Sequence, residues 1–482
     1  MPKISVADFT ALILRNLPYR ATSNQQEAAK LISEFIFRPA TEHSKPLFLL
    51  RGYAGTGKTS LLAAIVNSLP AIGIRSSLLA PTGRAAKVMA GYSGKPAFTI
   101  HRKIYIQHSN KSGIPVFKLR KNLHTSALFV VDEASMITNE YDNSEESFFR
   151  GHRLLSDLIE FVYSANCRLL LSGDTAQLPP VGTEISPALN TPLLKASFPV
   201  EIFEYELTEV VRQDKKSGIL LNATSLRNKI STGNHSFPLF SLSGIRDVIR
   251  VNGSELEELL NTNLHHESAE NTVIITRSNK RAVLYNQEVR RRILFREAMV
   301  SAGDLMMVVK NNYFWLPEGS DTGFIANGEM FEVMRIGKHE ELYGFKFCDA
   351  TIRLVDYENQ PLLEVKLLLD TLLSDSPSLS YEQNRQLFSE VMADYEEIRN
   401  RSERMKLARK NAWLNALQVK YAYALTCHKT QGGQWKHVFI DAAFLRGADA
   451  DRESLRWLYT AITRSAGKVY LVNFADSLFG TN

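Results

Sequence analysis

The sequence predicts an α/β protein built from two parallel-sheet lobes, and a pattern of short apolar runs is the main evidence. Each run is rich in leucine or β-branched residues and is followed by a polar turn and a helical pattern. Continuous apolar runs are typical of strands buried on both faces, as in a parallel sheet between two layers of helices. The runs form two series, residues 47–50, 78–80, 128–131 and 169–171 in the first, and 273–275, 438–440 and 469–472 in the second.

Two insertions interrupt this pattern. One contains the turn signal Asn110-Lys111-Ser112-Gly113 between two expected strands, which predicts a β-hairpin. The other begins with strand and turn signals of a small β-barrel and continues from Tyr381 to Leu417 as a helical pattern without glycine or proline. We therefore expect a first lobe over 1–94 and 124–196, the hairpin over 95–123, a second lobe over 197–298 and 420–482, and a barrel-and-helix domain over 299–419.

Composition narrows the class of protein. A chain of 482 residues is long enough for two to four domains, and it has no apolar run of about 18 residues that would span a membrane. The N-terminus lacks a small-residue cleavage site, and the three cysteines are far apart without metal-ligand spacing, so we expect a cytoplasmic protein without zinc or disulfides. The net charge of +6 is compatible with a polyanionic partner.

A phosphate-binding motif follows the first apolar run. Residues 52–59 fit G-x-x-x-x-G-K-[ST] between an expected strand and an expected helix. Backbone N–H groups of such a loop surround phosphates, the lysine reaches the β and γ phosphates, and the threonine hydroxyl can ligate Mg²⁺. The motif therefore predicts a site for ATP and Mg²⁺. Its expected contacts are Gly52, Ala54, Gly55, Thr56, Gly57, Lys58, Thr59 and Ser60.

Two adjacent carboxylates end the third apolar run. Asp132 and Glu133 follow Val130-Val131 at the expected exit of a buried strand. We expect Asp132 to hold Mg²⁺ and Glu133 to polarise the water that attacks the γ-phosphate. No second cluster of metal-binding carboxylates is apparent, which disfavours a nuclease.

Seven further motifs occur in order along the chain. They are Thr22-Ser23-Asn24-Gln25, 80–87 (APTGRAAK), Thr99-Ile100-His101, 173–182 (GDTAQLPPVG), 207–213 (LTEVVRQ), 426–434 (TCHKTQGGQ) and 458–464 (LYTAITR). With the two ATP-site motifs, the series resembles superfamily 1 helicases of the 5′→3′ group, which includes Dda-like and RecD-like enzymes. The resemblance spans nearly the whole chain. It implies two RecA-like lobes, a pin hairpin, an SH3-like domain and an ATP-dependent DNA helicase that translocates 5′→3′ on single-stranded DNA and unwinds duplexes.

The resemblance also implies roles for individual residues. Gln25 would read adenine, Gln177 would sense the γ-phosphate, and Arg212 and Arg464 would approach that phosphate from the second lobe. Gly432, next to Gln431, would couple DNA contact to nucleotide. The expected nucleic-acid contacts are Pro81, Thr82, Gly83, Lys87, Thr99, His101, Thr426 and His428.

The inserted hairpin would be the pin at the duplex junction, with Phe117 as a candidate wedge; a packing role for Phe117 is an equal alternative. The expected partners are single-stranded DNA and duplex junctions, with no membrane. An RNA-directed helicase of the same superfamily remains open, because stacking and phosphate contacts do not identify the sugar. A remodelling ATPase that does not unwind is a second alternative, disfavoured by the two arginines and the last two motifs.

Overall fold

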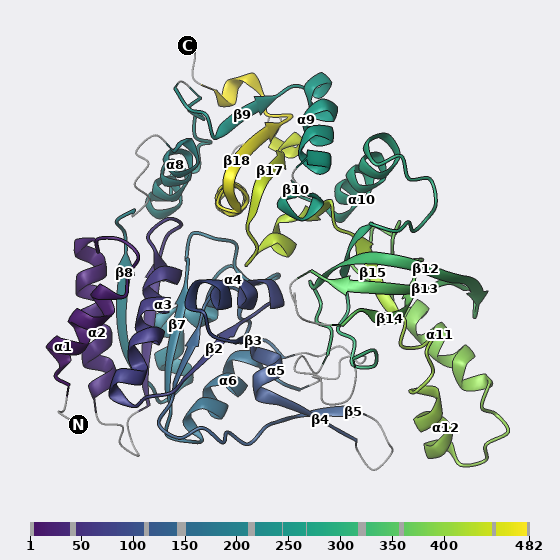
Figure 1. Cartoon of the computed structure of the whole chain (residues 1–482), viewed down its shortest axis with the longest axis horizontal. Helices are drawn as coiled ribbons and strands as arrows, with labels where there is room; N and C mark the ends of the chain where they lie inside the picture. Colours follow the sequence, from purple (N-terminus) through teal and green to yellow (C-terminus); the bar gives the residue numbers. More distant parts are fainter. Residues whose placement is uncertain are drawn as a thin grey trace.

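The structure is a computed structural model of the whole chain. Figure 1 shows one parallel sheet at the lower left, a second at the top and a barrel at the right. The described residues are 4–38, 45–109, 115–141, 151–210, 217–242, 244–266, 268–316, 324–355, 361–445 and 450–479.

The first sheet has six parallel strands in the order β3-β2-β6-β7-β1-β8. They are β1 (Pro46–Gly52), β2 (Ser76–Ala80), β3 (Ala97–Thr99), β6 (Leu128–Val131), β7 (Arg168–Gly173) and β8 (Glu201–Leu207). Its helices are α1 (Val6–Arg15), α2 (Ser23–Phe37), α3 (Lys58–Ser68), α4 (Gly83–Ser93), α5 (Ile100–Ile104), α6 (Leu154–Tyr163) and α7 (Thr191–Ser197). Phe48 and Leu50 pack with α1, α2 and α3, whereas Leu47 and Leu49 pack with α5 and α6. The apolar runs thus fill both faces of the sheet, as predicted.

Strand β8 lies outside the predicted first lobe. The predicted boundary at residue 196 assigned it to the second lobe, but it pairs with β1 from Pro46↔Glu201 to Gly52↔Leu207. As an edge strand it is only partly covered, and only Leu207 is buried. Its sequence, EIFEYEL, therefore lacks the continuous apolar run of the inner strands. The other domain boundaries remain predictions.

The second sheet has five parallel strands in the order β16-β10-β17-β18-β9. They are β9 (Val248–Val251), β10 (Thr272–Thr276), β16 (Ala424–Thr426), β17 (Trp435–Asp441) and β18 (Ser465–Val472). The helices of this lobe are α8 (Gly218–Thr232), α9 (Gly253–His266), α10 (Asn279–Glu288) and α13 (Arg452–Ile462). Helix α13 connects β17 to β18 and faces the first lobe, with α8 packed beside it.

Both insertions are present. The hairpin pairs β4 (Tyr105–Ser109) with β5 (Pro115–Leu119), and its predicted turn at residues 110–113 lies outside the described residues. The barrel closes from β11 (Leu305–Val308), β12 (Met330–Leu342), β13 (Phe345–Leu354), β14 (Leu363–Leu368) and β15 (Leu417–Tyr421). The helical pattern after it forms two helices, α11 (Tyr381–Ala393) and α12 (Arg401–Ala408), with Asn400 capping the second. The predicted fold class is thereby confirmed.

A buried ionic network fixes the barrel to the second sheet. The fully buried Asp304 carboxylate lies 3.0 Å from Arg290 Nη2 and 2.7 Å from Arg296 Nη1. The hydroxyl of Tyr423 donates to Asp304 Oδ1 at 3.2 Å. A buried carboxylate is tolerated when its oxygens are paired in this way, so the network sets a defined joint between the two units. No helix in the described part of the chain is long and apolar enough to cross a membrane.

Candidate active site

The loop from β1 to α3 has the geometry of a phosphate cradle. Gly55 and Gly57 both have φ of +78°, a conformation that favours glycine. A Cβ on Gly55 would also lie 2.8 Å from Leu220 Cδ2. Helix α3 begins at Lys58 without a side-chain cap, so its first N–H groups can bind an anion.

Lys58 and Thr59 lie at the start of α3 and face the end of β6. The Lys58 ammonium donates to the carbonyls of Gly52 at 2.7 Å and Tyr53 at 3.0 Å. The Thr59 hydroxyl donates to Asp132 Oδ2 at 3.1 Å. A hydroxyl and a carboxylate are both oxygen ligands, which Mg²⁺ prefers, so the pair fits this ion.

The Asp-Glu pair is held in a defined geometry after β6. Asp132 Oδ1 accepts from Ser172 Oγ at 3.1 Å and from the Glu133 N–H at 3.0 Å. Burial raises the pKa of Asp132, and the charge of Glu133 raises it further. Glu133 itself adopts φ of +54°, an uncommon conformation for this residue type, and its carboxylate faces the second lobe's Arg464.

Arg464 reaches this pair from the second lobe. It follows α13, is 4% exposed, and places Nη1 at 3.7 Å from Glu133 Oε1. Its Nε also donates to the Thr460 carbonyl at 3.2 Å. The structure therefore places Arg464 beside Glu133, while its contact with the γ-phosphate remains a prediction. Arg212 lies outside the described residues.

Tyr459 is a functional candidate that the sequence analysis missed. Its hydroxyl accepts from the Ala54 N–H of the phosphate loop at 2.9 Å and donates to Asp174 Oδ2 at 2.7 Å. Both Tyr459 and Asp174 are buried, and burial raises the pKa of each. A residue of α13 thus binds the phosphate loop of the other lobe directly. Its only signal in the sequence is its position within the 458–464 motif.

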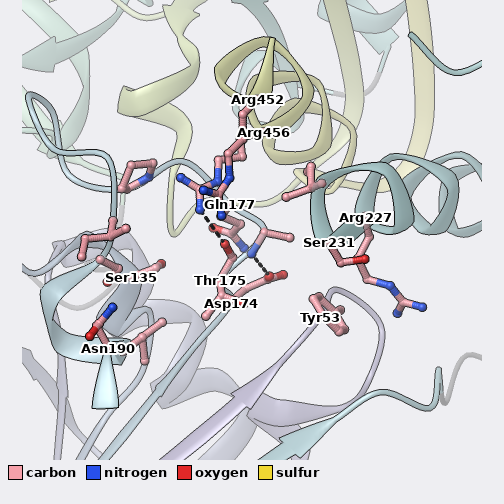
Figure 2. Close-up of a pocket in the computed structure, with 16 residues that line it drawn as sticks. Tyr53, Ser135, Asp174, Thr175, Gln177, Asn190, Arg227, Ser231, Arg452 and Arg456 are labelled. Atoms are coloured by element: carbon pink, nitrogen blue, oxygen red, sulfur yellow. Dashed lines mark hydrogen bonds between the residues drawn. The ribbon is translucent and has the colours of Figure 1, made fainter. Parts of the chain in front are cut away.

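The motif around Gln177 connects the lobes through backbone groups. The Leu178 N–H donates to Thr460 Oγ1 at 2.9 Å, and the Leu178 carbonyl accepts from Gln431 Nε2 at 2.7 Å. Gln177 is 5% exposed, and its Oε1 has no hydrogen-bond partner among the described residues. Figure 2 shows Gln177 between Asp174 and the arginines of α13.

Gln25 lies against the phosphate loop. Its Nε2 donates to the Thr56 carbonyl at 3.0 Å and to the Tyr19 hydroxyl at 3.2 Å. Its Oε1 accepts from the Thr22 N–H at 3.2 Å, which completes the cap of α2. The amide therefore links the start of α2 to the loop; its adenine contact remains a prediction.

The expected nucleic-acid residues lie at the ends of β2, β3 and β16, the edge of parallel sheets where ligands gather. Thr82, which follows Pro81, caps α4 at Gly83, and Thr99 caps α5, which carries His101. Thr426 precedes His428, whose pKa is lowered by burial. Their contact with a strand remains a prediction.

Two of these residues lie at contacts between parts of the chain. A Cβ on Gly432 would be 3.0 Å from Thr82 Oγ1. The motif at 426–434 in the second lobe is therefore in close contact with the start of α4. Lys87 Nζ donates to the Val355 carbonyl of the barrel at 2.8 Å. Helix α4 therefore contacts both the second lobe and the barrel.

Phe117 packs inside the protein, which corrects its prediction as a wedge. Its side chain is 5% exposed, and its ring centroid lies 4.7 Å from that of Tyr313. Tyr313 in turn packs on Phe324 at 4.8 Å. A wedge must face the duplex, whereas Phe117 fastens the hairpin to the barrel insertion.

Two facing parallel-sheet lobes, a phosphate loop with a buried Asp-Glu pair, and an arginine from the opposite lobe define a P-loop NTPase of the two-lobe RecA-like class. A family model described as an AAA domain matches residues 34–235, and one described as a UvrD-like helicase C-terminal domain matches residues 421–472. Over these two segments the chain is similar to proteins of the AAA-domain and UvrD-like helicase families.

Two curated relatives are similar to less than half of the chain, and a solved structure is similar to most of it. The ATP-dependent RecD2 DNA helicase of Deinococcus radiodurans is 30% identical over 37% of this chain and 21% of its own length. The ATP-dependent DNA helicase dda of enterobacteria phage T4 is 29% identical over 43% of this chain and 42% of its own length. A crystal structure of Pif1 helicase from Bacteroides with ADP-AlF3 and ssDNA is 15% identical, with a TM-score of 0.47 over 96% of this chain and 95% of that one.

Proposed function

We propose that this chain is an ATP-dependent DNA helicase that translocates 5′→3′ on single-stranded DNA and unwinds duplexes at junctions. The observation that carries the proposal is that one site is built by both lobes, with Arg464 at 3.7 Å from Glu133 and Tyr459 on the Ala54 N–H. A cation supplied across a cleft stabilises transition-state charge only when the lobes are closed. The two curated relatives that match part of the chain are both named as ATP-dependent DNA helicases. Their names support DNA as the polymer and unwinding as the reaction.

The residues divide the chemistry of hydrolysis among them. Lys58 would bind the β and γ phosphates, and Thr59 and Asp132 would hold Mg²⁺, which would supply positive charge to the phosphates. Glu133 orients the attacking water for in-line displacement. Gln177, Arg464 and Arg212 act on the γ-phosphate, while Gln25 recognises the base. The remaining loop contacts, Gly52, Ala54, Gly55, Thr56, Gly57 and Ser60, shape the phosphate pocket. Gly432 of the second lobe couples DNA contact to nucleotide.

Nucleotide binding and nucleic-acid binding are coupled because the segments around Leu178 and Gln431 contact residues of both candidate sites. Gln431 binds the Leu178 carbonyl next to Gln177, while Gly432 rests on α4 behind Thr82. A closing movement at the nucleotide therefore shifts the strand contacts at Thr82, Thr99 and Thr426 relative to one another. Alternating grip on a strand by two lobes gives directional stepping. The three cysteines are all free and buried, which agrees with work in the reducing cytoplasm.

The proposal is tested by ATP turnover and unwinding. We expect oligo(dT) to stimulate ATP hydrolysis strongly and oligo(U) to do so weakly, and duplexes with a 5′ tail to be unwound where those with a 3′ tail are not. Stimulation by RNA alone would support the RNA-directed alternative. A rate of ATP hydrolysis that neither DNA nor RNA stimulates would contradict a motor on either polymer.

A further inference from the structure

A cavity of about 260 Å³ lies between the lobes, beside the candidate nucleotide site. We call it the arginine cavity because three arginines of the second lobe line it, namely Arg227 on α8 and Arg452 and Arg456 on α13. Tyr53, Ser135, Asp174 and Gln177 line it from the first lobe (Figure 2). Tyr53 of the phosphate loop lines it but Lys58, Thr59 and Gln25 do not, so the cavity adjoins the phosphate cradle without coinciding with it.

The lining carries a net positive charge. Its charged side chains are three arginines and one aspartate, so their formal charge is +2. Arg456 is 8% exposed and uses Nη1 to donate to the Glu184 carbonyl at 2.7 Å. Burial lowers the pKa of Arg456, and the charge of Arg452 lowers it further, so the two cations repel each other. A bound dianion would relieve this repulsion.

Unpaired polar atoms point to a ligand independently of charge. Ser135 Oγ, Ser186 Oγ, Gln177 Oε1 and Arg456 Nε are all buried, all belong to residues that line the cavity, and have no hydrogen-bond partner among the described residues. Leaving such a buried group without a hydrogen bond is destabilising. Two hydroxyls and a guanidinium N–H can donate to an oxyanion, and the Gln177 oxygen can accept from a protonated oxygen of the same ion.

The position of the cavity relates it to the product of hydrolysis. Ser135 follows Glu133 by two residues, and Tyr53 belongs to the phosphate loop. Tyr459 donates a hydrogen bond to Asp174 of the cavity lining and accepts one from the Ala54 N–H of that loop. Sites for drug-sized ligands occupy roughly 300–1,000 Å³, so this cavity suits a small ion better than a nucleotide.

We propose that the arginine cavity is a binding site for inorganic phosphate, the dianion released when ATP is cleaved. The assignment of phosphate as product rests on the proposed function. Direct binding of the ion does not, because it can be measured without turnover.

The test is calorimetric titration of inorganic phosphate into the full chain saturated with ADP and Mg²⁺. We expect Arg452→Gln to weaken phosphate binding about tenfold, the scale of one charge-assisted contact. Ser186→Ala should weaken it less and leaves the charge unchanged. The matched control is Arg335→Gln, which removes an exposed arginine of the barrel and should bind as the wild type does.

The outcomes separate this site from the phosphate loop and from the proposed function. Binding that is lost in Lys58→Ala but kept in Arg452→Gln would place the ion in the loop and overturn the inference. Equal affinity in Arg452→Gln, Ser186→Ala and wild type would overturn it as well. Binding that depends on Arg452 in a chain without ATPase activity would leave the site standing and refute the proposed function.

Discussion

Replacing Lys58 with alanine is expected to reduce ATP hydrolysis by about 10³-fold or more, because the loss of a cation on the transferring phosphate removes stabilisation that strengthens in the transition state. DNA-stimulated turnover, measured with coupled ATPase assays, should fall to background. Unwinding of 5′-tailed duplexes should be lost with it.

The fold should survive this change. In the structure the Lys58 ammonium binds only the Gly52 and Tyr53 carbonyls of its own loop among the contacts described, so thermal unfolding should be close to that of the wild type. Single-stranded DNA binding without nucleotide should also be retained. ATP-dependent unwinding by a folded Lys58→Ala variant would remove this loop from the mechanism.

Replacing Arg464 with alanine is expected to cost about 10³-fold in ATP turnover while nucleotide affinity changes little, since an arginine supplied across a cleft acts mainly on the transition state. Arg464→Lys keeps the charge but not the forked geometry, and should recover only part of the activity. Quench-flow turnover and fluorescent-nucleotide binding, measured on the same preparations, separate the two effects.

Arg464 is buried, so its replacement needs a control for stability. Its Nε donates to the Thr460 carbonyl, and melting curves will show whether losing that contact loosens α13. Arg335→Ala serves as the matched exposed control. A folded Arg464→Ala variant that turns over ATP like the wild type would mean that the second lobe takes no part in hydrolysis.

Much of the fold could be predicted because it depends on local pattern. Leu47 to Leu50 and Leu128 to Val131 read as continuous apolar runs since helices cover both faces of their strands. β8 was assigned to the wrong lobe because an edge strand does not need such a run. The long helical pattern after Tyr381 gave no sign of its division into α11 and α12.

Candidate site residues could be identified where they form a motif of consecutive residues, as in the phosphate loop and the Asp132-Glu133 pair. Contacts between distant segments were not. Tyr459 and Ala54 are 405 positions apart, and nothing local marks their hydrogen bond. Phe117 presented the same difficulty, because an aromatic side chain in a hairpin can face a duplex or pack against Tyr313.

The central claim, that two lobes close together on one nucleotide, is tested most directly by the distance between them. The three native cysteines are buried, so new cysteines at the exposed Glu34 on α2 and Glu258 on α9 can be labelled selectively for energy transfer. We expect ADP with aluminium fluoride, Mg²⁺ and oligo(dT) to shorten and narrow the distance distribution relative to the nucleotide-free chain, and Arg464→Ala to abolish that change. A distance that stays the same with and without nucleotide in the wild type would contradict the claim.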